Sequence, residues 1–152
     1  MSLHSVAPRL SLLVMVASLA CSDNPVGPGD LPRTESVGAL IGVLQQQGAT
    51  VVPMEHLSRE SHCLSVGAVR LAVDGENVYV FEYESAEAAN TDARTVSADG
   101  DAINGAGRAC SFFWIGPPRF YKKDRLIVLY VGTNQDLIRM LDGLLGRPFA
   151  GR

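Results

Sequence analysis

The dipeptide Asp74-Gly75 is the feature that most restricts how this chain can fold. It separates two stretches rich in apolar residues, 64–73 and 76–83. Asp-Gly favours a two-residue type I′ turn, in which both positions need positive φ, so the two stretches predict an antiparallel hairpin. Counting outward from the turn gives two cross-strand pairs that are expected to face the core, Leu71 with Val78 and Val69 with Val80.

The opposite face of the second strand carries three aromatic rings, those of Tyr79, Phe81 and Tyr83. A two-residue period places all three on one side, and Arg70 lies on the same side of the first strand. If helices cover the rings completely, the rings belong to the core; if they stay open, they form an apolar patch of the kind that marks interaction sites. We expect one helix to cover only part of this face, which leaves the remaining edge, with Arg70 beside it, as the candidate binding surface.

The pattern of apolar and polar residues in the rest of the sequence predicts three helices and four more strands. Apolar residues at helical spacing indicate helices at about 34–48, with Thr34 as N-cap, at 85–96 and at 134–146. Strands are predicted at 49–54, 111–115, 119–122 and 126–131, and loops at 55–63 and 97–108. The order α-β-β-β-α-β-β-β-α contains more hairpins than alternating strand–helix units. It therefore predicts an α+β fold, a mostly antiparallel sheet of five to six strands with three packed helices.

An uncharged apolar run, residues 10–20, follows Arg9 near the start of the chain. A bilayer-spanning helix needs roughly 20 apolar residues, so this run is too short for one. A base, a short apolar run and the small residues within 18–20, just before Cys21, are together typical of a secretory signal peptide. We therefore expect residues 1–20 to be a signal peptide that is removed on export.

The sequence Ser-Leu-Ala-Cys at 18–21 resembles the lipobox of bacterial lipoproteins, whose cysteine is diacylated and becomes the new N-terminus. The resemblance implies that Cys21 carries lipid and holds the protein on the cell envelope. Ser22 after the cysteine resembles lipoproteins sent to the outer membrane, where the organism has one. Ser18 stands where the family prefers Leu. The same tripeptide also fits an ordinary signal-peptidase cut, which would leave Cys21 as a free thiol.

Two further segments follow the expected cleavage point. Residues 21–33 hold the cysteine and a stretch rich in Pro and Gly, which predicts a flexible tether, and 34–152 are expected to form a single domain. Residues 119–132 with the following helix also resemble the end of a small domain found in uncharacterised exported bacterial proteins, which implies no activity. Without residues 1–20 the chain has 12 bases and 16 acids, a net charge of −4. That acidity argues against nucleic acid as a partner.

Two cysteines remain in the expected domain, Cys63 and Cys110. In an exported compartment they most simply pair with each other, and each directly precedes a predicted strand. The alternative uses the same region as a metal site with His56 and His62, or uses His62 and Cys63 as a base and nucleophile. No two of these residues have a standard metal-ligand spacing, and no residue that would orient the histidine is identifiable.

Basic residues within 119–125 lie next to aromatic residues within 112–121. Such a combination can bind nucleobases, glycans or anionic lipid, but strand alternation buries half of the rings, so we favour a core with charges on a hairpin tip. Taken together, the residues favour a lipid-anchored envelope protein with a non-enzymatic binding domain and no cofactor. Its partners would be the membrane and an envelope protein or a small molecule. The alternative is a small metal-binding protein or enzyme that uses His56, His62 and Cys63.

Overall fold

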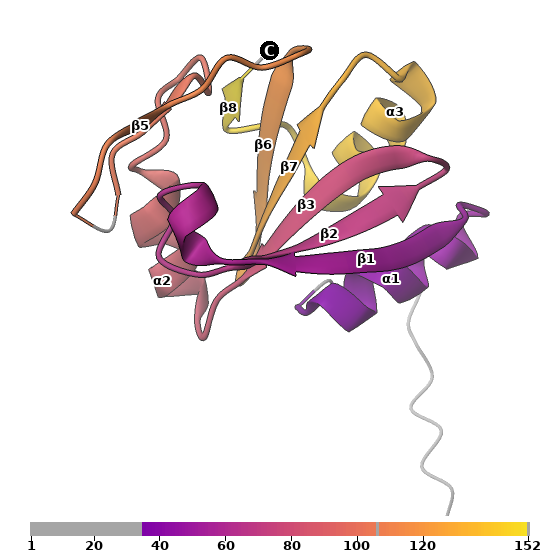
Figure 1. Ribbon diagram of the computed structural model, residues 1–152. Coiled ribbons are helices and arrows are strands. Elements are labelled where there is room, and N and C mark those ends of the chain that lie inside the picture. Colours follow the sequence, from indigo (N-terminus) through magenta and orange to yellow (C-terminus); the bar gives the residue numbers. More distant parts are fainter. Residues whose placement is uncertain (1–34, 106, 152) are drawn as a thin grey trace, which may run out of the picture.

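The computed structural model describes residues 35–105 and 107–151 (Figure 1). The apolar run 10–20 and Cys21 therefore lie outside the described residues. Within the described part, no helix is long and apolar enough to cross a membrane. In chain order the elements are α1 Val37–Gln46, β1 Val51–Leu57, the 3-10 helix η1 Arg59–Ser61, β2 Ala68–Val73, β3 Glu76–Glu82, α2 Ala86–Ala93, β4 Ala102–Ile103, β5 Cys110–Ser111, β6 Pro118–Lys123, β7 Leu126–Val131, α3 Gln135–Leu145 and β8 Ala150–Gly151.

Six strands form one sheet in the order β1-β2-β3-β7-β6-β8, and β4 pairs with β5 in a separate two-stranded sheet. Every neighbouring pair is antiparallel. The described part of the chain thus has an α+β architecture, with three α-helices and a mostly antiparallel sheet. This confirms the predicted fold class.

The Asp74-Gly75 turn has the backbone that a tight hairpin requires. Its φ angles are +50° at Asp74 and +86° at Gly75, the positive values that a type I′ turn needs. Leu71 lies opposite Val78 and Val69 opposite Val80, as predicted. Because side chains alternate along a strand, this register decides which residues of β2 and β3 face each side of the sheet.

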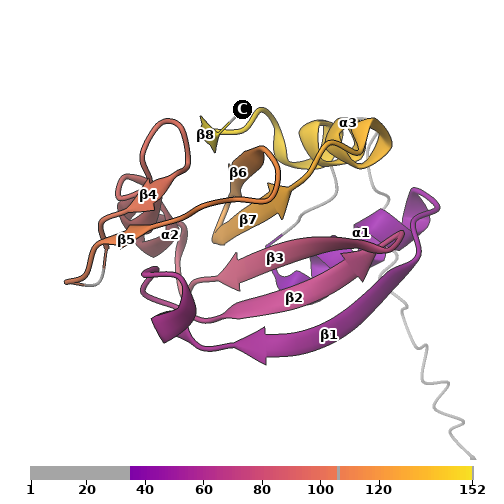
Figure 2. The same ribbon diagram turned by 45° about the horizontal axis from the view of Figure 1, so that its top comes forward.

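Each face of the sheet carries its own apolar core. On the first face, side chains of α1 and α3 pack with Val78, Val80 and Val128. On the second face, Phe81 and Ile127 pack with α2, with the disulfide cysteines and with side chains of residues 96–114. Figures 1 and 2 show α1 and α3 together on one side of the molecule, and α2 with the β4–β5 sheet on the other. The second face therefore lacks the continuous helical cover that the first one has.

Polar side chains cap the three helices. The Ser36 hydroxyl accepts a hydrogen bond in the first turn of α1, so the N-cap is Ser36 and not Thr34. Ser85 caps α2, as predicted, but that helix ends at Ala93, earlier than predicted. Asn134 caps α3. Since these groups satisfy backbone N–H donors that have no partner inside a helix, they fix where each helix begins.

The start of the described chain is fastened to the middle of the large sheet. The Arg125 Nε donates a hydrogen bond of 2.5 Å to the Glu35 carbonyl, and Arg125 Nη2 lies 2.5 Å from Glu82 Oε1. The other carboxylate oxygen of Glu82 accepts a hydrogen bond of 2.9 Å from the Val37 N–H. Glu82 belongs to β3 and Arg125 directly precedes β7, so the entry of the chain is bonded to the two central strands.

β1 is longer than predicted and runs through Pro53 to Leu57, where a loop was expected. β1 is an edge strand that pairs only with β2, and a proline, which has no N–H, is tolerated on such an edge. The register shifts between Pro53 and His56, which indicates a bulge. Prolines and bulges both discourage an exposed edge from pairing with another chain.

The strand predicted at 111–115 is largely absent. Only Cys110 and Ser111 are in a strand, and their partner β4 lies in a region predicted as a loop. Residues 112–115 have no strand partner, and we call them the crossing segment because they connect the small sheet to the large one (Figure 2). Phe112 and Trp114 of this segment pack against the apolar cluster of the second sheet face.

Candidate functional site

The second face of the sheet contains an apolar floor built from its two central strands. Tyr79 and Phe81 on β3 pair with Leu129 and Ile127 on β7, so their side chains share one face. Val131 continues this face along β7. Tyr83, which directly follows β3, belongs to the same apolar cluster as Tyr79 and Phe81, so the three rings gather on one face of the sheet.

The three rings of this stripe differ in burial. Tyr83 and Phe81 are 2% and 1% exposed, and Tyr83 lies beneath α2, whose Asp92 accepts a hydrogen bond from its hydroxyl. Tyr79, farther along the strand, is only half-buried. One helix thus covers part of the face, and Tyr79 marks the part that it leaves open.

A pocket of about 340 Å³ lies over this open part. One wall comes from the connection between β1 and β2, and the other is the crossing segment. The residues that line it are all uncharged, and most are apolar or aromatic. They are Leu57, Ser61, His62, Asn77, Tyr79, Phe81, Phe112, Phe113, Trp114, Ile115, Leu129 and Val131.

The crossing segment keeps the alternation of a strand although it has no partner strand. Phe112 and Trp114 are partly buried and stack with their ring centres 4.7 Å apart, and the Trp114 indole N–H donates a hydrogen bond of 2.9 Å to the Gly100 carbonyl. Phe113 and Ile115 are 100% and 102% exposed. Two fully exposed apolar side chains at the rim of an apolar pocket are unusual for a surface that contacts only water.

His62 lies in the wall formed by the β1–β2 connection. It is 9% exposed, and its ring meets that of Phe81 edge-on at 4.9 Å between ring centres. Neither ring nitrogen has a hydrogen-bond partner among the described residues. Burial lowers the pKa of His62, and the nearby Glu60 carboxylate opposes this shift only in part. At neutral pH burial therefore favours the uncharged imidazole, and neither nitrogen is hydrogen-bonded to a described residue.

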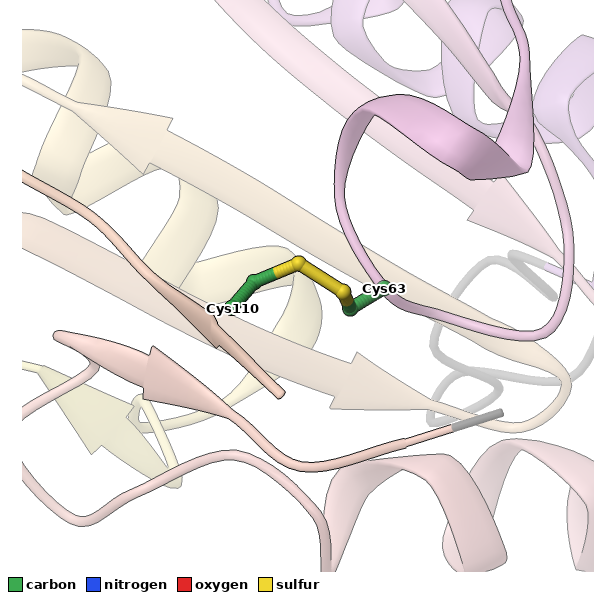
Figure 3. The surroundings of a disulfide bond; sticks show 2 residues. All are labelled: Cys63 and Cys110. Atoms are coloured by element: carbon green, nitrogen blue, oxygen red, sulfur yellow. A yellow bond between two sulfur atoms is a disulfide. The ribbon is translucent and has the colours of Figure 1, made fainter. Parts of the chain in front are cut away.

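A disulfide bonds Cys63, in the β1–β2 connection, to Cys110, at the start of β5 (Figure 3). It links the two segments that carry the walls of the pocket. Cys63 follows His62 directly, and Cys110 lies two residues before Phe112. The predicted pairing is thus present. The bridge connects a loop to the short strand β5, and not two neighbouring strand starts as the sequence suggested.

The disulfide also affects the alternative hypothesis, in which His56, His62 and Cys63 form a metal site or a catalytic pair. The Cys63 sulfur is bonded to Cys110, so the disulfide form offers no thiolate at this position. His56 lies on the exposed edge strand β1, whereas His62 is buried in the pocket wall. The described residues contain no group of three or more His, Cys, Asp or Glu that could hold a metal ion.

Arg70 lies beside the pocket and is not among the residues that line it. Its guanidinium forms an ion pair of 3.1 Å with Glu55 on the neighbouring strand. Its Nη1 also lies 3.5 Å from the Asn77 side-chain oxygen. Arg70 therefore borders the candidate surface, as expected, with its charge already paired to an acid.

The basic residues near the aromatic run mostly bond to the chain itself. Arg119 donates a hydrogen bond to the Gly132 carbonyl, and Lys123 donates one to the Leu144 carbonyl. Arg125 is bonded to Glu82. Phe120 and Tyr121 are fully buried. These contacts favour the interpretation of this stretch as core and structural ion pairing over that of a basic binding patch.

Several pocket residues could not be assigned to a site from the sequence, chiefly Leu57, Trp114, Leu129 and Val131. The sequence shows a run of aromatic residues at 112–114, but nothing in it places this run over Tyr79. Comparisons with protein-family models, with curated proteins and with solved structures give no significant match to this chain. The chemistry of the pocket therefore rests on its geometry alone.

Proposed function

We propose that this chain is an exported protein held on the cell envelope by a lipid on Cys21, and that its domain is a non-enzymatic binding module. Its ligand is a small, uncharged and largely apolar molecule that occupies the pocket over Tyr79. The leader 1–20, the cysteine at its end and the Pro/Gly-rich tether support export and anchoring. The pocket supports the binding role.

The observation that carries the binding role is the composition of the pocket. Its volume of about 340 Å³ lies at the lower end of the range of roughly 300–1,000 Å³ that is typical of small-molecule sites. Its lining offers a broad apolar surface with few polar groups, which is the usual design of such sites. Because none of the lining side chains is charged, a charged ligand would lose its water shell without gaining an ion pair.

Trp114 allows a direct test, because it is the only tryptophan in the chain and lines the pocket. We would titrate the 15N-labelled domain with p-xylene and follow the single indole N–H resonance. The proposal expects this resonance to shift in a saturable way, together with backbone signals of β3 and β7. Tyr79→Ala should weaken this binding because it removes part of the floor. A matched control is Val52→Ala, which changes an exposed residue on β1 away from the pocket.

The result that would overturn the binding role is equally direct. If p-xylene leaves the indole resonance unchanged up to its solubility limit, the pocket is not a site for small apolar molecules. The same holds if Tyr79→Ala and Val52→Ala bind p-xylene equally well, because the shift would then arise elsewhere.

A further inference from the structure

The buried imidazole of His62 is the polar group of the pocket that the chain itself leaves unsatisfied. Both ring nitrogens are enclosed and have no partner among the described residues. A buried polar atom without a hydrogen bond is unfavourable, so such groups usually have a partner that belongs to the working state of the protein. His62 lines the pocket, so a bound molecule can supply that partner once the ring turns a nitrogen toward it.

The surroundings of His62 restrict what that molecule can be. A neutral imidazole has one nitrogen that donates and one that accepts, and a hydroxyl group can also do both. A hydroxyl therefore matches either tautomer. A carboxylate could accept a hydrogen bond from the imidazole N–H, but no charged residue lines the pocket and burial disfavours an imidazolium, so its lost hydration would be poorly compensated.

We propose that the pocket selects an uncharged apolar molecule that carries a hydroxyl group, and that His62 binds this hydroxyl. The inference rests on the proposed binding function and specifies its ligand class. The body of the ligand lies on Tyr79 and Leu129, between the two walls, and its hydroxyl points toward the β1–β2 connection. Members of this class include phenols and the alcohols of small hydrocarbons.

The hydrogen bond requires the imidazole to turn, because both nitrogens are buried and neither is exposed to the pocket. The torsion about the Cβ–Cγ bond of histidine is broad, so the torsion itself adds little to the cost of turning the ring. The present ring is held by its edge contact with Phe81 and by no hydrogen bond. Rotation thus exchanges one packing arrangement for another and breaks no polar interaction.

The test compares two ligands of nearly equal shape, p-xylene and p-cresol, which differ by a methyl and a hydroxyl group. Dissociation constants are measured for the wild type, His62→Phe and His62→Gln by following the Trp114 indole resonance. One hydrogen bond is expected to make p-cresol bind about three- to tenfold more tightly in the wild type than in His62→Phe, with p-xylene little changed. His62→Gln keeps a donor and an acceptor and should retain part of the preference. His56→Phe, on the exposed edge strand, is the matched control and should change neither constant.

Each outcome separates this inference from the function on which it rests. If p-xylene binds and His62→Phe leaves the ratio of the two constants unchanged, the role of His62 is wrong while the binding pocket stands. If the anion p-toluate binds more tightly than p-cresol, the ligand class is wrong. If neither p-xylene nor p-cresol binds to the folded wild type, the proposed function itself fails. Should His62→Phe not fold, the wild type still tests the inference, because equal dissociation constants for p-xylene and p-cresol would contradict a hydrogen bond to the ligand hydroxyl.

Discussion

The hydroxyl of Tyr83 donates a hydrogen bond of 3.0 Å to the Asp92 carboxylate, in a place where the two residues are 2% and 6% exposed. The same carboxylate oxygen accepts a hydrogen bond of 2.6 Å from the Ser65 N–H. Burial first, and then the Asp92 charge, raise the pKa of Tyr83 above its usual range, so the hydroxyl remains a donor. One acidic side chain thus connects α2, β3 and the loop that follows the disulfide.

Asp92→Ala is expected to destabilise the domain strongly. It would leave the Tyr83 hydroxyl and the Ser65 N–H without a partner, at roughly 1–3 kcal/mol for each buried group. Denaturant unfolding of the variant and the wild type measures the difference. Thr91→Ala, one residue earlier on the exposed side of α2, is the control and should be nearly neutral. A loss below about 0.5 kcal/mol in Asp92→Ala would show that these bonds contribute little.

Tyr83→Ala and Tyr79→Ala should differ sharply although both remove a ring from the same face of β3. Tyr83 is buried, and truncation of a buried aromatic ring costs about 3–5 kcal/mol. Tyr79 is half-buried, so its truncation should cost less than half as much and act mainly on p-xylene binding. Thermal unfolding and the indole titration separate the two effects. Equal losses of stability would show that Tyr79 belongs to the core and not to a binding floor.

The double variant Cys63→Ala/Cys110→Ala should lose stability and pocket affinity together. The cysteines are 47 positions apart, and the chain-entropy treatment gives a loop of this length roughly 4 kcal/mol. Because the bridge joins both walls of the pocket, its loss should also weaken p-xylene binding. A reductant should destabilise the wild type but not the double variant. Unchanged affinity in a folded double variant would mean that the walls keep their spacing without the bridge.

The lowered pKa of His62 predicts a pH dependence of stability. The ordinary value is 6.5, and burial places the folded-state value below it. Between the two values the unfolded chain binds a proton that the folded domain does not, so stability falls as the pH drops below about 6.5 and levels off under the folded-state pKa. Unfolding free energies from pH 8 to pH 4.5 measure this. His62→Phe should flatten that part of the profile and His56→Phe should not; the opposite pattern would contradict the assignment.

Cys21→Ala should release the protein from the membrane fraction or leave it unprocessed, because the lipid would lose its attachment point. Cell fractionation and mass spectrometry of the mature N-terminus are the measurements. Ser22→Ala keeps the cysteine and serves as the control for processing. A wild-type mature protein that is wholly soluble, with an unmodified N-terminal cysteine, would rule out the anchor and leave ordinary secretion.

The parts of the fold that the sequence predicted correctly are those fixed by local chemistry. Asp74-Gly75 determined a register, and Ser85 and the apolar run of β7 marked a helix start and a buried strand. The errors arose where tertiary context decides. Pro53 was expected to end a strand, but β1 is an edge, and an edge strand tolerates a residue without an N–H.

The candidate site was predictable only in part for the same reason. Alternation placed Tyr79, Phe81 and Tyr83 on one face, because a strand repeats every two residues. Which ring α2 covers depends on where that helix packs against the sheet. The hydrogen bond between Asp92 and Tyr83 holds the helix there, and no pattern in the sequence identifies Asp92 for this role. The crossing segment lies near Tyr79 because of the tertiary fold and the Cys63–Cys110 disulfide. No local sequence pattern therefore predicts that this segment forms the second wall of the pocket.

The bonds that fasten Glu35 and Val37 to Arg125 and Glu82 would have a mechanical consequence if the N-terminus is anchored as proposed. A pull on the chain ahead of Glu35 loads the two central strands of the sheet and not an edge strand that could peel away. The pocket lies on the opposite face of the sheet from α1, so in the proposed anchored protein a pull on the N-terminal segment would not act first on the pocket walls. Force and ligand would therefore act on separate sides of one sheet.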